Sequence, residues 1–528
     1  MNGAESLVHT LLEGGVDVCF TNPGTSEMHF VAALDHIPGM RCVLGLFEGV
    51  VTGAADGYYR IAQRPASTLL HLGPGLANGL ANLHNAKKAS SGIVNVVGEH
   101  ALNHIALDAP LTADIEGLAR PMSHWVRTSR AAQAIAADGA QAVLEANAPP
   151  GRIATLILPA DTAWSDAGRA PEGGANGAGA LAAKLAAARA MRAPSADAVR
   201  AAARELRSGE PVLLLLGGRA LREGTLEIAG RIAAATGCAL MSEFYTARLA
   251  RGAGRVIAPR LPYAVDPALA ALAPFRRIVL VGTRPPVAFF AYPDKPGLLA
   301  PAHAAISTLA GADEDLDAAL RMLADEVGAT RLASVGVAQR APAGALPDGR
   351  ITPDGIAAVL AALMPENAIV VDEAVTSGRA FGPPTACAAP HDWLTAMGGS
   401  IGFGLPVAIG AAIAAPDRKV LALEGDGSAM YTLQSLWTMA RESLDVTVLI
   451  FANRAYQILR GEFAGVGAGA PGPRATDMLT LDRPNLDWVS LARGMGVEAG
   501  RAEDLGQLAA QVRRAIAHRG PSLVEVVI

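Results

Sequence analysis

The sequence predicts an α/β protein built from three doubly wound parallel-sheet domains. Short aliphatic runs, typical of strands buried on both faces, alternate along the chain with stretches whose apolar residues recur at helical spacing. Most runs end near Gly, Pro, Asn or Asp, as the loops between parallel strands and helices do. The 528 residues are too many for one hydrophobic core, and this length favours three domains.

Each predicted domain contains several strands with helical sequence between them. We expect an N-terminal domain at residues 1–165, a middle domain at 198–335 and a C-terminal domain at 350–528. The predicted strands cover residues 17–20, 42–44, 68–70, 93–97 and 154–158, then 212–216, 239–241 and 278–281, then 368–371, 420–423, 446–451 and 523–528. Residues 166–197 and 340–347 are predicted to be linkers, the first of them partly helical.

The composition argues against several classes of partner. The net charge is −5 and there is no basic tail, so neither nucleic acid nor an anionic membrane is expected as the main partner. The four scattered cysteines lack metal-binding spacing and fit free thiols in a reducing cytosol. The chain start has no signal-peptide pattern, and the apolar runs are too short to cross a membrane. We therefore expect a cytoplasmic protein.

One stretch of the third domain carries a chemical signal. The strand at 420–423 leads into Glu424-Gly425-Asp426-Gly427-Ser428, and the next predicted strand ends near Asn453. The carboxyl ends of parallel strands meet at one edge of a sheet, where such sheets bind ligands. Glycines let the backbone approach phosphate, and carboxylate and amide oxygens suit Mg²⁺. The pattern favours a magnesium–diphosphate site, although a plain turn followed by a helix cap would use the same residues.

Further motifs follow one another along the whole chain. They are Phe20-Thr21-Asn22-Pro23-Gly24-Thr25-Ser26-Glu27, Leu46-Phe47-Glu48-Gly49, Ala54-Ala55-Asp56-Gly57-Tyr58, Gly73-Pro74-Gly75 and Gly398-Gly399-Ser400-Ile401-Gly402-Phe403-Gly404-Leu405-Pro406. Together with the Gly-Asp-Gly turn and Asn453, this order resembles the thiamine-diphosphate-dependent enzymes, especially the acetolactate synthase and benzoylformate decarboxylase group. The resemblance implies that the first domain binds the pyrimidine of thiamine diphosphate and the third binds its diphosphate.

Glu48 is the first candidate catalytic residue. It follows a predicted strand and stands beside the apolar residues Leu46 and Phe47, a setting that favours a neutral carboxylic acid able to share its proton. In the family, the glutamate at this place hydrogen-bonds the cofactor's aminopyrimidine and promotes loss of the thiazolium proton. Without the other motifs, a plain acid at a helix start would be the simpler interpretation.

The resemblance also implies the residues that hold the cofactor. Asp426 and Asn453 would bind Mg²⁺ together with the Ala455 carbonyl, although Ala452 stands where the family has a further asparagine. The other expected cofactor contacts are Thr376, Ser377, Gly399, Ile401, Gly425, Gly427, Ser428 and Tyr456. FAD is not expected, because the stretch 217–219 is too little for a flavin signature.

Two residues are candidates for contact with the substrate. His71 follows the predicted strand at 68–70, where an imidazole could reach the cleft and move protons near neutral pH. The resemblance gives His71 a role with the reaction intermediates and gives Ser26 a contact with the substrate carboxylate. A structural histidine and a helix cap at Ser26 stay open as alternatives, and we expect His29 to be structural.

The middle domain departs from the benzoylformate decarboxylase pattern. Where that group has a second histidine, residues 286–294 contain Phe289 and Phe290 but no histidine. Slow protonation after CO₂ loss would favour transfer to a second carbonyl, as in acetolactate synthesis, although the loop motifs that accompany acetolactate formation are not found. Arg460 and Glu462 could face a substrate, but we expect a solvated ion pair.

The resemblance thus predicts a thiamine-diphosphate- and Mg²⁺-dependent lyase or transferase, an acetolactate synthase-like decarboxylase and carboligase of 2-oxo acids. The first alternative is a benzoylformate-type decarboxylase that releases an aldehyde. A cofactor-binding or regulatory protein without turnover, and a nucleotide-binding oxidoreductase, are alternatives of other classes. No Gly-x-Gly-x-x-Gly motif after the first strand supports the last of these. The family architecture implies a homodimer or homotetramer in which Glu48 and Asp426 of different subunits serve one cofactor.

Overall fold

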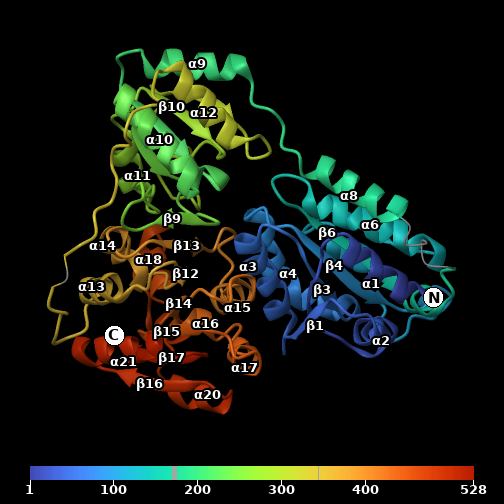
Figure 1. The fold of residues 1–528 in the computed structure, drawn as a ribbon. Helices are drawn as coiled ribbons and strands as arrows, with labels where there is room; N and C mark the ends of the chain where they lie inside the picture. Colours follow the sequence, from blue (N-terminus) through green and yellow to red (C-terminus); the bar gives the residue numbers. More distant parts are fainter. Residues whose placement is uncertain (169–174, 343) are drawn as a thin grey trace.

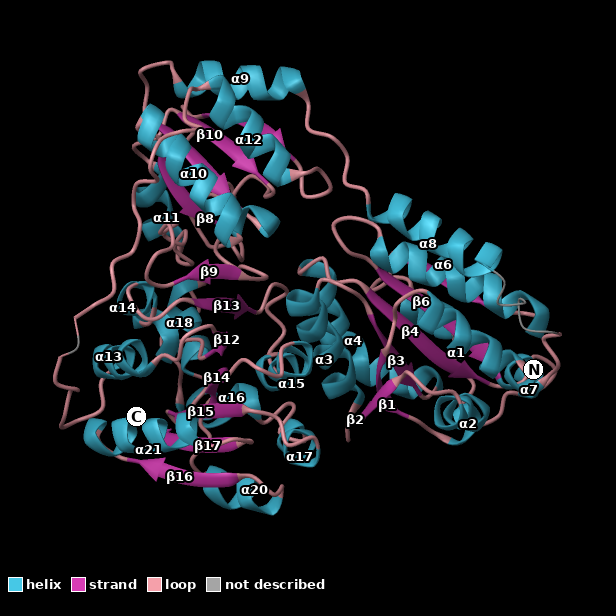
Figure 2. Ribbon diagram, in the orientation of Figure 1, coloured by secondary structure: helices cyan, strands magenta, loops and turns pink. Residues whose placement is uncertain are grey.

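The chain forms three lobes, each built around its own sheet (Figure 1). The computed structural model describes residues 1–168, 175–342 and 344–528, and only the backbone of 175–179. The sheets contain six, four and seven strands, and helices cover their faces (Figure 2). None of the described helices is long and apolar enough to cross a membrane.

The first lobe has a wholly parallel sheet in the order β2-β1-β3-β4-β6-β5. Its strands are β1 (Val18–Asn22), β2 (Arg41–Leu44), β3 (Ala66–Leu70), β4 (Ile93–Glu99), β5 (Trp125–Thr128) and β6 (Ile153–Pro159). Its helices are α1 (Gly3–Glu13), α2 (Met28–His36), α3 (Glu48–Ala62), α4 (Leu72–Lys88), α5 (Ile115–Ala119), α6 (Ile135–Asn147), α7 (Ala160–Trp164) and α8 (Ala175–Arg189), with 3₁₀ turns η1 (Thr25–Glu27), η2 (Ile105–Leu107) and η3 (Ala132–Ala134).

The middle lobe has a smaller parallel sheet in the order β11-β10-β7-β8. Its strands are β7 (Val212–Leu216), β8 (Ala239–Ser242), β10 (Arg277–Val281) and β11 (Ala305–Ala310). Its helices are α9 (Ala196–Leu206), α10 (Glu223–Thr236), α11 (Val265–Leu272) and α12 (Leu316–Glu326), with the 3₁₀ turn η4 (Gly218–Leu221).

The third lobe has a sheet in the order β16-β17-β15-β14-β12-β13-β9. Its strands are β9 (Leu249–Arg251), β12 (Ala368–Glu373), β13 (His391–Thr395), β14 (Val420–Gly425), β15 (Val446–Ala452), β16 (Glu498–Ala502) and β17 (Ser522–Val527). Only β9, which comes from the middle of the chain, runs antiparallel to its neighbour. The helices are α13 (Pro353–Leu363), α14 (Gly382–Ala386), α15 (Gly404–Ala414), α16 (Asp426–Ala429), α17 (Ser435–Arg441), α18 (Gln457–Gly465), α19 (Pro473–Met478), α20 (Trp488–Gly494) and α21 (Leu505–Ala517), with the 3₁₀ turn η5 (Ser377–Ala380).

The predicted fold class is confirmed, and every predicted strand overlaps an observed one. The strands β5, β9, β11, β13 and β16 were missed. Except for β13 these lie at sheet edges, where a strand pairs on one side and needs no continuous aliphatic run. Residues 169–174 and 343 of the predicted linkers lie outside the described residues. The stretch after residue 174 forms α8, whose Leu181 and Leu185 are buried in the core of the first lobe.

Helix α3 of the first lobe lies against α15 of the third, and the two lie side by side in Figure 1. A Cβ on Gly57 would stand 2.1 Å from the carbonyl oxygen of Val407, and one on Gly410 would stand 1.9 Å from that of Ala54. Only glycine permits backbones to approach so closely. One hydrophobic core therefore runs through the first and third lobes, whereas the middle lobe has cores of its own.

Replacing Gly410 by alanine tests this contact. The added Cβ would overlap the Ala54 carbonyl, so the helices must separate, and we expect a loss of about 1–3 kcal/mol in the free energy of unfolding. Gly224→Ala on α10 is the matched control, because a Cβ there meets nothing within 4 Å. Urea denaturation compares the two variants. Equal effects of both substitutions would contradict the contact.

Candidate active site

The first lobe gathers polar side chains where its strands end. Glu48 begins α3 and is only 9% exposed. Its Oε2 accepts a hydrogen bond of 2.9 Å from Asn78 Nδ2 on α4. A Cβ on Gly75 would lie 3.2 Å from the other oxygen, Oε1, so the glycine makes room for the carboxyl group. The predicted catalytic glutamate is thus largely shielded from water, with one amide donor on it.

His71 directly follows β3 and meets the loop after β1. Its Nδ1 lies 2.9 Å from Glu27 Oε2, and Ser26 Oγ donates to Glu27 Oε1 at 2.5 Å. Glu27 is 3% exposed, and the Gly24 N–H donates to it at 2.7 Å. A carboxylate on Nδ1 fixes the ring and leaves Nε2 as the nitrogen available to a ligand. Glu27 was not among the predicted site residues, although its spacing from Gly24 matches a turn closed by an acid.

In the third lobe, Asp426 follows β14 and Asn453 follows the neighbouring parallel strand β15. Asp426 is 3% exposed, and its two oxygens accept from the Gly427 and Arg454 N–H groups at 2.9 and 2.7 Å. Asn453 Oδ1 accepts from the Ala455 N–H at 3.0 Å. Burial raises the pKa of Asp426.

A bound cation fits this arrangement. Within the described chain, Asp426 forms no ion pair with a lysine or arginine side chain, so its buried charge lacks a cationic partner. A buried charge is costly unless it is paired or binds a metal ion. The oxygen groups nearby are a carboxylate, an amide and a backbone carbonyl, which are the hard ligands that Mg²⁺ takes.

Other predicted cofactor contacts lie at the same sheet edge. The ring of Tyr456 packs on Gly427, where an added Cβ would stand 2.6 Å from Tyr456 Cε1. Ser428 lies on α16 and is 6% exposed. Thr376 and Ser377 follow β12, which pairs with β14. The structure therefore places these residues at the same sheet edge as Asp426, whereas Gly399 and Ile401 lie in the loop between β13 and α15.

Three of these strand ends carry strained backbone. Leu72, next to His71, has φ +46°; Val375, next to Thr376, has φ +48°; and Arg454, next to Asn453, has φ +56°. Left-handed φ values are uncommon for residues other than glycine and are most costly for a β-branched residue such as Val375. Such strain, worth about 1–3 kcal/mol each, is concentrated at functional sites in proteins.

Helix α4 ties the start of α3 to the loop before α15 within one chain. Asn82 Nδ2 donates to the Gly49 carbonyl at 2.8 Å and to the Gly402 carbonyl at 3.1 Å. Asn85 Nδ2 donates to the Ser400 carbonyl at 2.8 Å. Neither asparagine was among the predicted site residues, because their partners are remote in sequence.

The histidine-free stretch of the middle lobe lies against this loop. The ring tip of Phe289 would stand 2.7 Å from a Cβ on Gly399. The rings of Tyr245, Tyr263 and Phe290 surround Phe289 with centroid separations of 5.9, 5.5 and 4.8 Å. An aromatic wall therefore borders the exposed side of Gly399.

The ion pair expected between Arg460 and Glu462 is wrong. Arg460 Nη2 donates instead to Thr480 Oγ1 at 2.5 Å. Glu462 faces the middle lobe, where burial and its hydrogen bond with the Tyr292 hydroxyl raise the pKa of Tyr292. The two side chains point to different partners because residues two apart on a helix, here α18, do not face each other.

At the carboxyl edge of the middle sheet, protein side chains fill the space beside the turn at Gly217 and Gly218. Glu243 accepts from the Gly218 N–H at 3.2 Å and from Thr283 Oγ1 at 2.8 Å. A Cβ on Gly217 would lie 2.7 Å from Thr283 Cβ and 2.8 Å from Glu243 Cδ. Burial raises the pKa of Glu243 to about 7, so the neutral carboxyl group predominates only below about pH 7.

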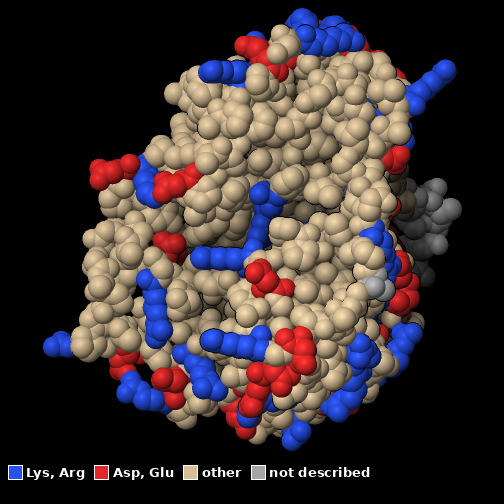
Figure 3. Space-filling model, turned by 90° about the vertical axis from the view of Figure 1, so that its left-hand side faces the viewer, with Lys and Arg blue, Asp and Glu red and all other residues tan. Residues whose placement is uncertain are grey.

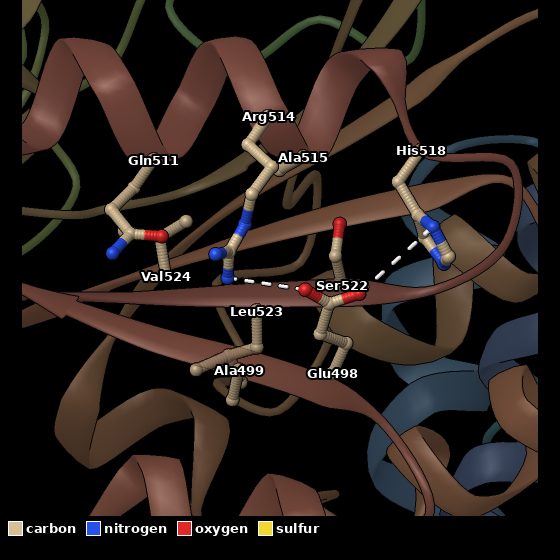
Figure 4. A pocket seen from close by; sticks show the side chains of 9 residues that line it. All are labelled: Glu498, Ala499, Gln511, Arg514, Ala515, His518, Ser522, Leu523 and Val524. Atoms are coloured by element: carbon tan, nitrogen blue, oxygen red, sulfur yellow. Dashed lines mark ion pairs between the residues drawn. The ribbon is translucent and has the colours of Figure 1, made fainter.

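A small cavity beneath α21 lies away from these sites (Figure 4). Arg514 and His518 face Glu498 across it at 3.1 and 4.0 Å. Glu498 and Ser522 begin β16 and β17, so the cavity lies at the edge of the sheet opposite Asp426. With about 10 Å³ it has room for no more than a water molecule.

On the face drawn in Figure 3, acidic and basic side chains are interspersed.

Comparison with known proteins gives two matching family models. The model for the thiamine pyrophosphate enzyme, N-terminal TPP binding domain, matches residues 1–118, and the model for the C-terminal TPP binding domain matches residues 380–526. A Mycobacterium tuberculosis protein named as a candidate acetolactate synthase large subunit is 51% identical over 100% of this chain and 99% of its own. Benzoylformate decarboxylase of Pseudomonas aeruginosa is 31% identical over 97% of this chain and 96% of its own.

A solved structure has the same fold. The thiamine diphosphate-dependent 4-hydroxybenzoylformate decarboxylase of Rhodococcus jostii superposes with a TM-score of 0.83 at 24% identity, over 99% of this chain and 98% of its own.

The pH dependence of stability tests the neutral state of Glu243. Its folded pKa of about 7 exceeds the ordinary value of 4.5, so folding takes up a proton between these values. The stabilisation is complete below about pH 4.5 and is lost as the pH rises through 7. Glutamine has the shape of a protonated glutamic acid but cannot ionise. The melting temperature of Glu243→Gln should therefore fall less than that of the unmodified protein between pH 5 and 8. Glu13→Gln, a substitution on the surface, is the control. If the melting temperatures of Glu243→Gln and Glu13→Gln change with pH in the same way, the assignment is contradicted.

Proposed function

The chain belongs to the thiamine-diphosphate-dependent enzymes, and from this premise we propose that it decarboxylates a 2-oxo acid and joins the remaining acyl unit to an acceptor carbonyl. One observation carries the choice of reaction. Phe289, which cannot carry a proton, stands at Gly399. Because Gly399 is expected to contact the cofactor, this side of the site offers no side-chain proton for the release of an aldehyde. The full-length relative at 51% identity, whose name is that of an acetolactate synthase subunit, supports the same choice.

The cofactor site of this proposal draws on both lobes. When bound, thiamine diphosphate supplies a nucleophilic carbon and takes up the electron pair left by departing CO₂. Asp426, Asn453 and the Ala455 carbonyl would hold Mg²⁺. Gly425, Gly427 and Ser428, with Thr376 and Ser377, would contact the diphosphate, and Tyr456 packs beside them. Gly399 and Ile401 would contact the organic part of the cofactor.

In this proposal side chains of the protein act as the acids and bases of the reaction. Glu48 holds a proton for the aminopyrimidine ring, and Asn78 keeps its carboxyl group in place at 2.9 Å. His71 moves a proton through Nε2, while Glu27 fixes Nδ1. The Ser26 hydroxyl donates a hydrogen bond to Glu27. Contact between Ser26 and a substrate carboxylate would require this hydrogen bond to break.

Release of an aldehyde, as by a benzoylformate-type decarboxylase, is the second candidate. The aromatic wall around Phe289 favours it, because stacked rings suit a substrate with an aromatic side chain. His71 would then be the proton donor. A protein without turnover is less consistent with the buried Glu48 and the uncompensated charge of Asp426.

Product analysis decides between these reactions. With thiamine diphosphate, Mg²⁺ and a panel of 2-oxo acids that includes pyruvate and benzoylformate, we expect CO₂ release and a 2-hydroxy ketone product, detected by mass spectrometry. Glu48→Gln should lower kcat by on the order of 10²–10⁴, as loss of acid–base catalysis does. Glu13→Gln on α1 is the control. An aldehyde as sole product would select the second candidate, and no CO₂ from any substrate would refute both.

Mixing two inactive variants tests the proposed homodimer or homotetramer. If Glu48 and Asp426 of different subunits serve one cofactor, a dimer of Glu48→Gln with Asp426→Ala chains contains one intact site. Random exchange should then restore about a quarter of full activity. The bridge from Gly49 through Asn82 to Gly402 is made within one chain, however. No recovery after verified exchange would therefore mean that each chain serves its own cofactor.

A further inference from the structure

The loop before α15 is held by side chains from two lobes. It comprises residues 398–404 and carries Gly399 and Ile401, which are expected to contact the cofactor. On one side its carbonyl oxygens face α4 of the first lobe. Three side chains of α4 reach these oxygens at 2.8–3.1 Å, namely Asn82, His84 and Asn85.

Two N–H groups of the same loop donate to a single carboxyl group of the third lobe. Glu373 ends β12, and its Oε1 and Oε2 accept from the Gly402 and Gly404 N–H groups at 3.0 and 2.7 Å. The side chain is 4% exposed, so water does not compete for these hydrogen bonds. A carboxyl group that accepts one N–H on each oxygen fixes both donors in place.

The loop depends on such external support because its own backbone is unusually free. Gly399 and Gly402 have φ values of +70° and +88°, in the left-handed region that favours glycine. Neither residue has a side chain that could pack and hold the loop. Glu424 lies beside Glu373 on β14, but within the described chain no N–H or hydroxyl group donates to its carboxyl oxygens. The two N–H bonds of the loop therefore depend on Glu373.

Glu373 also stands at the other end of the candidate cofactor site. It directly precedes the turn at 374–377, in which Thr376 and Ser377 are expected to contact the diphosphate. The same residue thus belongs to the strand end that leads into this turn and binds the loop expected to contact the organic part of the cofactor.

We propose that Glu373 is a positioning residue for thiamine diphosphate. By holding the Gly402 and Gly404 N–H groups, it fixes the loop of Gly399 and Ile401 relative to the turn of Thr376 and Ser377. It acts through the loop and does not itself touch the cofactor. This inference rests on the cofactor contacts proposed above.

Comparison of two ligands separates positioning from a general defect. The full chain without cofactor is titrated calorimetrically with thiamine diphosphate and, separately, with pyrophosphate, both in excess Mg²⁺. Pyrophosphate has no organic part, so its binding does not require the loop. Glu373→Gln leaves one N–H group without an acceptor, because an amide has a single oxygen. This variant should bind thiamine diphosphate about tenfold or more weakly, whereas its affinity for pyrophosphate should change less than about twofold.

Glu525→Gln is the matched control and should bind both ligands normally. Glu525 is a glutamate of the same sheet, 3% exposed, but it lies on β17 and bonds Arg501 at 2.9 Å instead of the loop. Thermal melting without ligand shows whether each variant is folded. If Glu373→Gln does not fold, Glu373→Asp replaces it, because a side chain one methylene shorter cannot reach both N–H groups.

Two results would overturn the inference alone. They are unchanged affinity of a folded Glu373 variant for thiamine diphosphate, and an equal loss of affinity for both ligands, which would mark a merely structural role. If the unmodified protein binds no thiamine diphosphate, the inference fails together with the cofactor site proposed above.

Discussion

The backbone contact between α3 and α15 is the constraint on which the candidate site depends. Helix α3 begins at Glu48, and α15 begins directly after the loop that carries Gly399. Because Gly57 and Gly410 let carbonyl oxygens occupy the space of a side chain, the separation of the helices is set by backbone atoms. Side-chain rearrangement cannot relax such a contact. The geometry of the site is therefore fixed in the core shared by two lobes rather than in its loops.

The sequence predicted every interior strand except β13, but it missed four of the six strands at sheet edges. A strand buried on both faces is largely apolar, so β7 and β15 were predictable from local pattern. Strand β9 has only three residues and pairs antiparallel with β13, far along the chain. Its place depends on how the middle lobe docks, which no local pattern encodes. The same holds for α8, whose alanines suggest a linker although its two leucines are buried in the first lobe.

The candidate site was predictable where a residue's place follows from the strand before it. His71, Asp426 and Asn453 each stand directly after a strand, and parallel strands bring such positions to one edge. The groups that orient them were not predictable, since Glu27 meets His71, and Asn82 meets Gly402, only after folding. Likewise, the sequence revealed the absence of a histidine in residues 286–294, but not that Phe289 would stand at Gly399.

The balance of buried charges separates structural groups from candidate binding groups. Arg60 and Asp56 satisfy each other through hydrogen bonds of 2.8 and 2.7 Å, so this pair needs no ligand. Glu424 lies against Glu373, and burial raises its pKa well above the ordinary value, so it stays neutral by keeping a proton. Asp426 has neither solution within the described chain, because only backbone N–H groups donate to it. Since a buried charge is stable only when it is compensated, Asp426 indicates a cation from outside the chain.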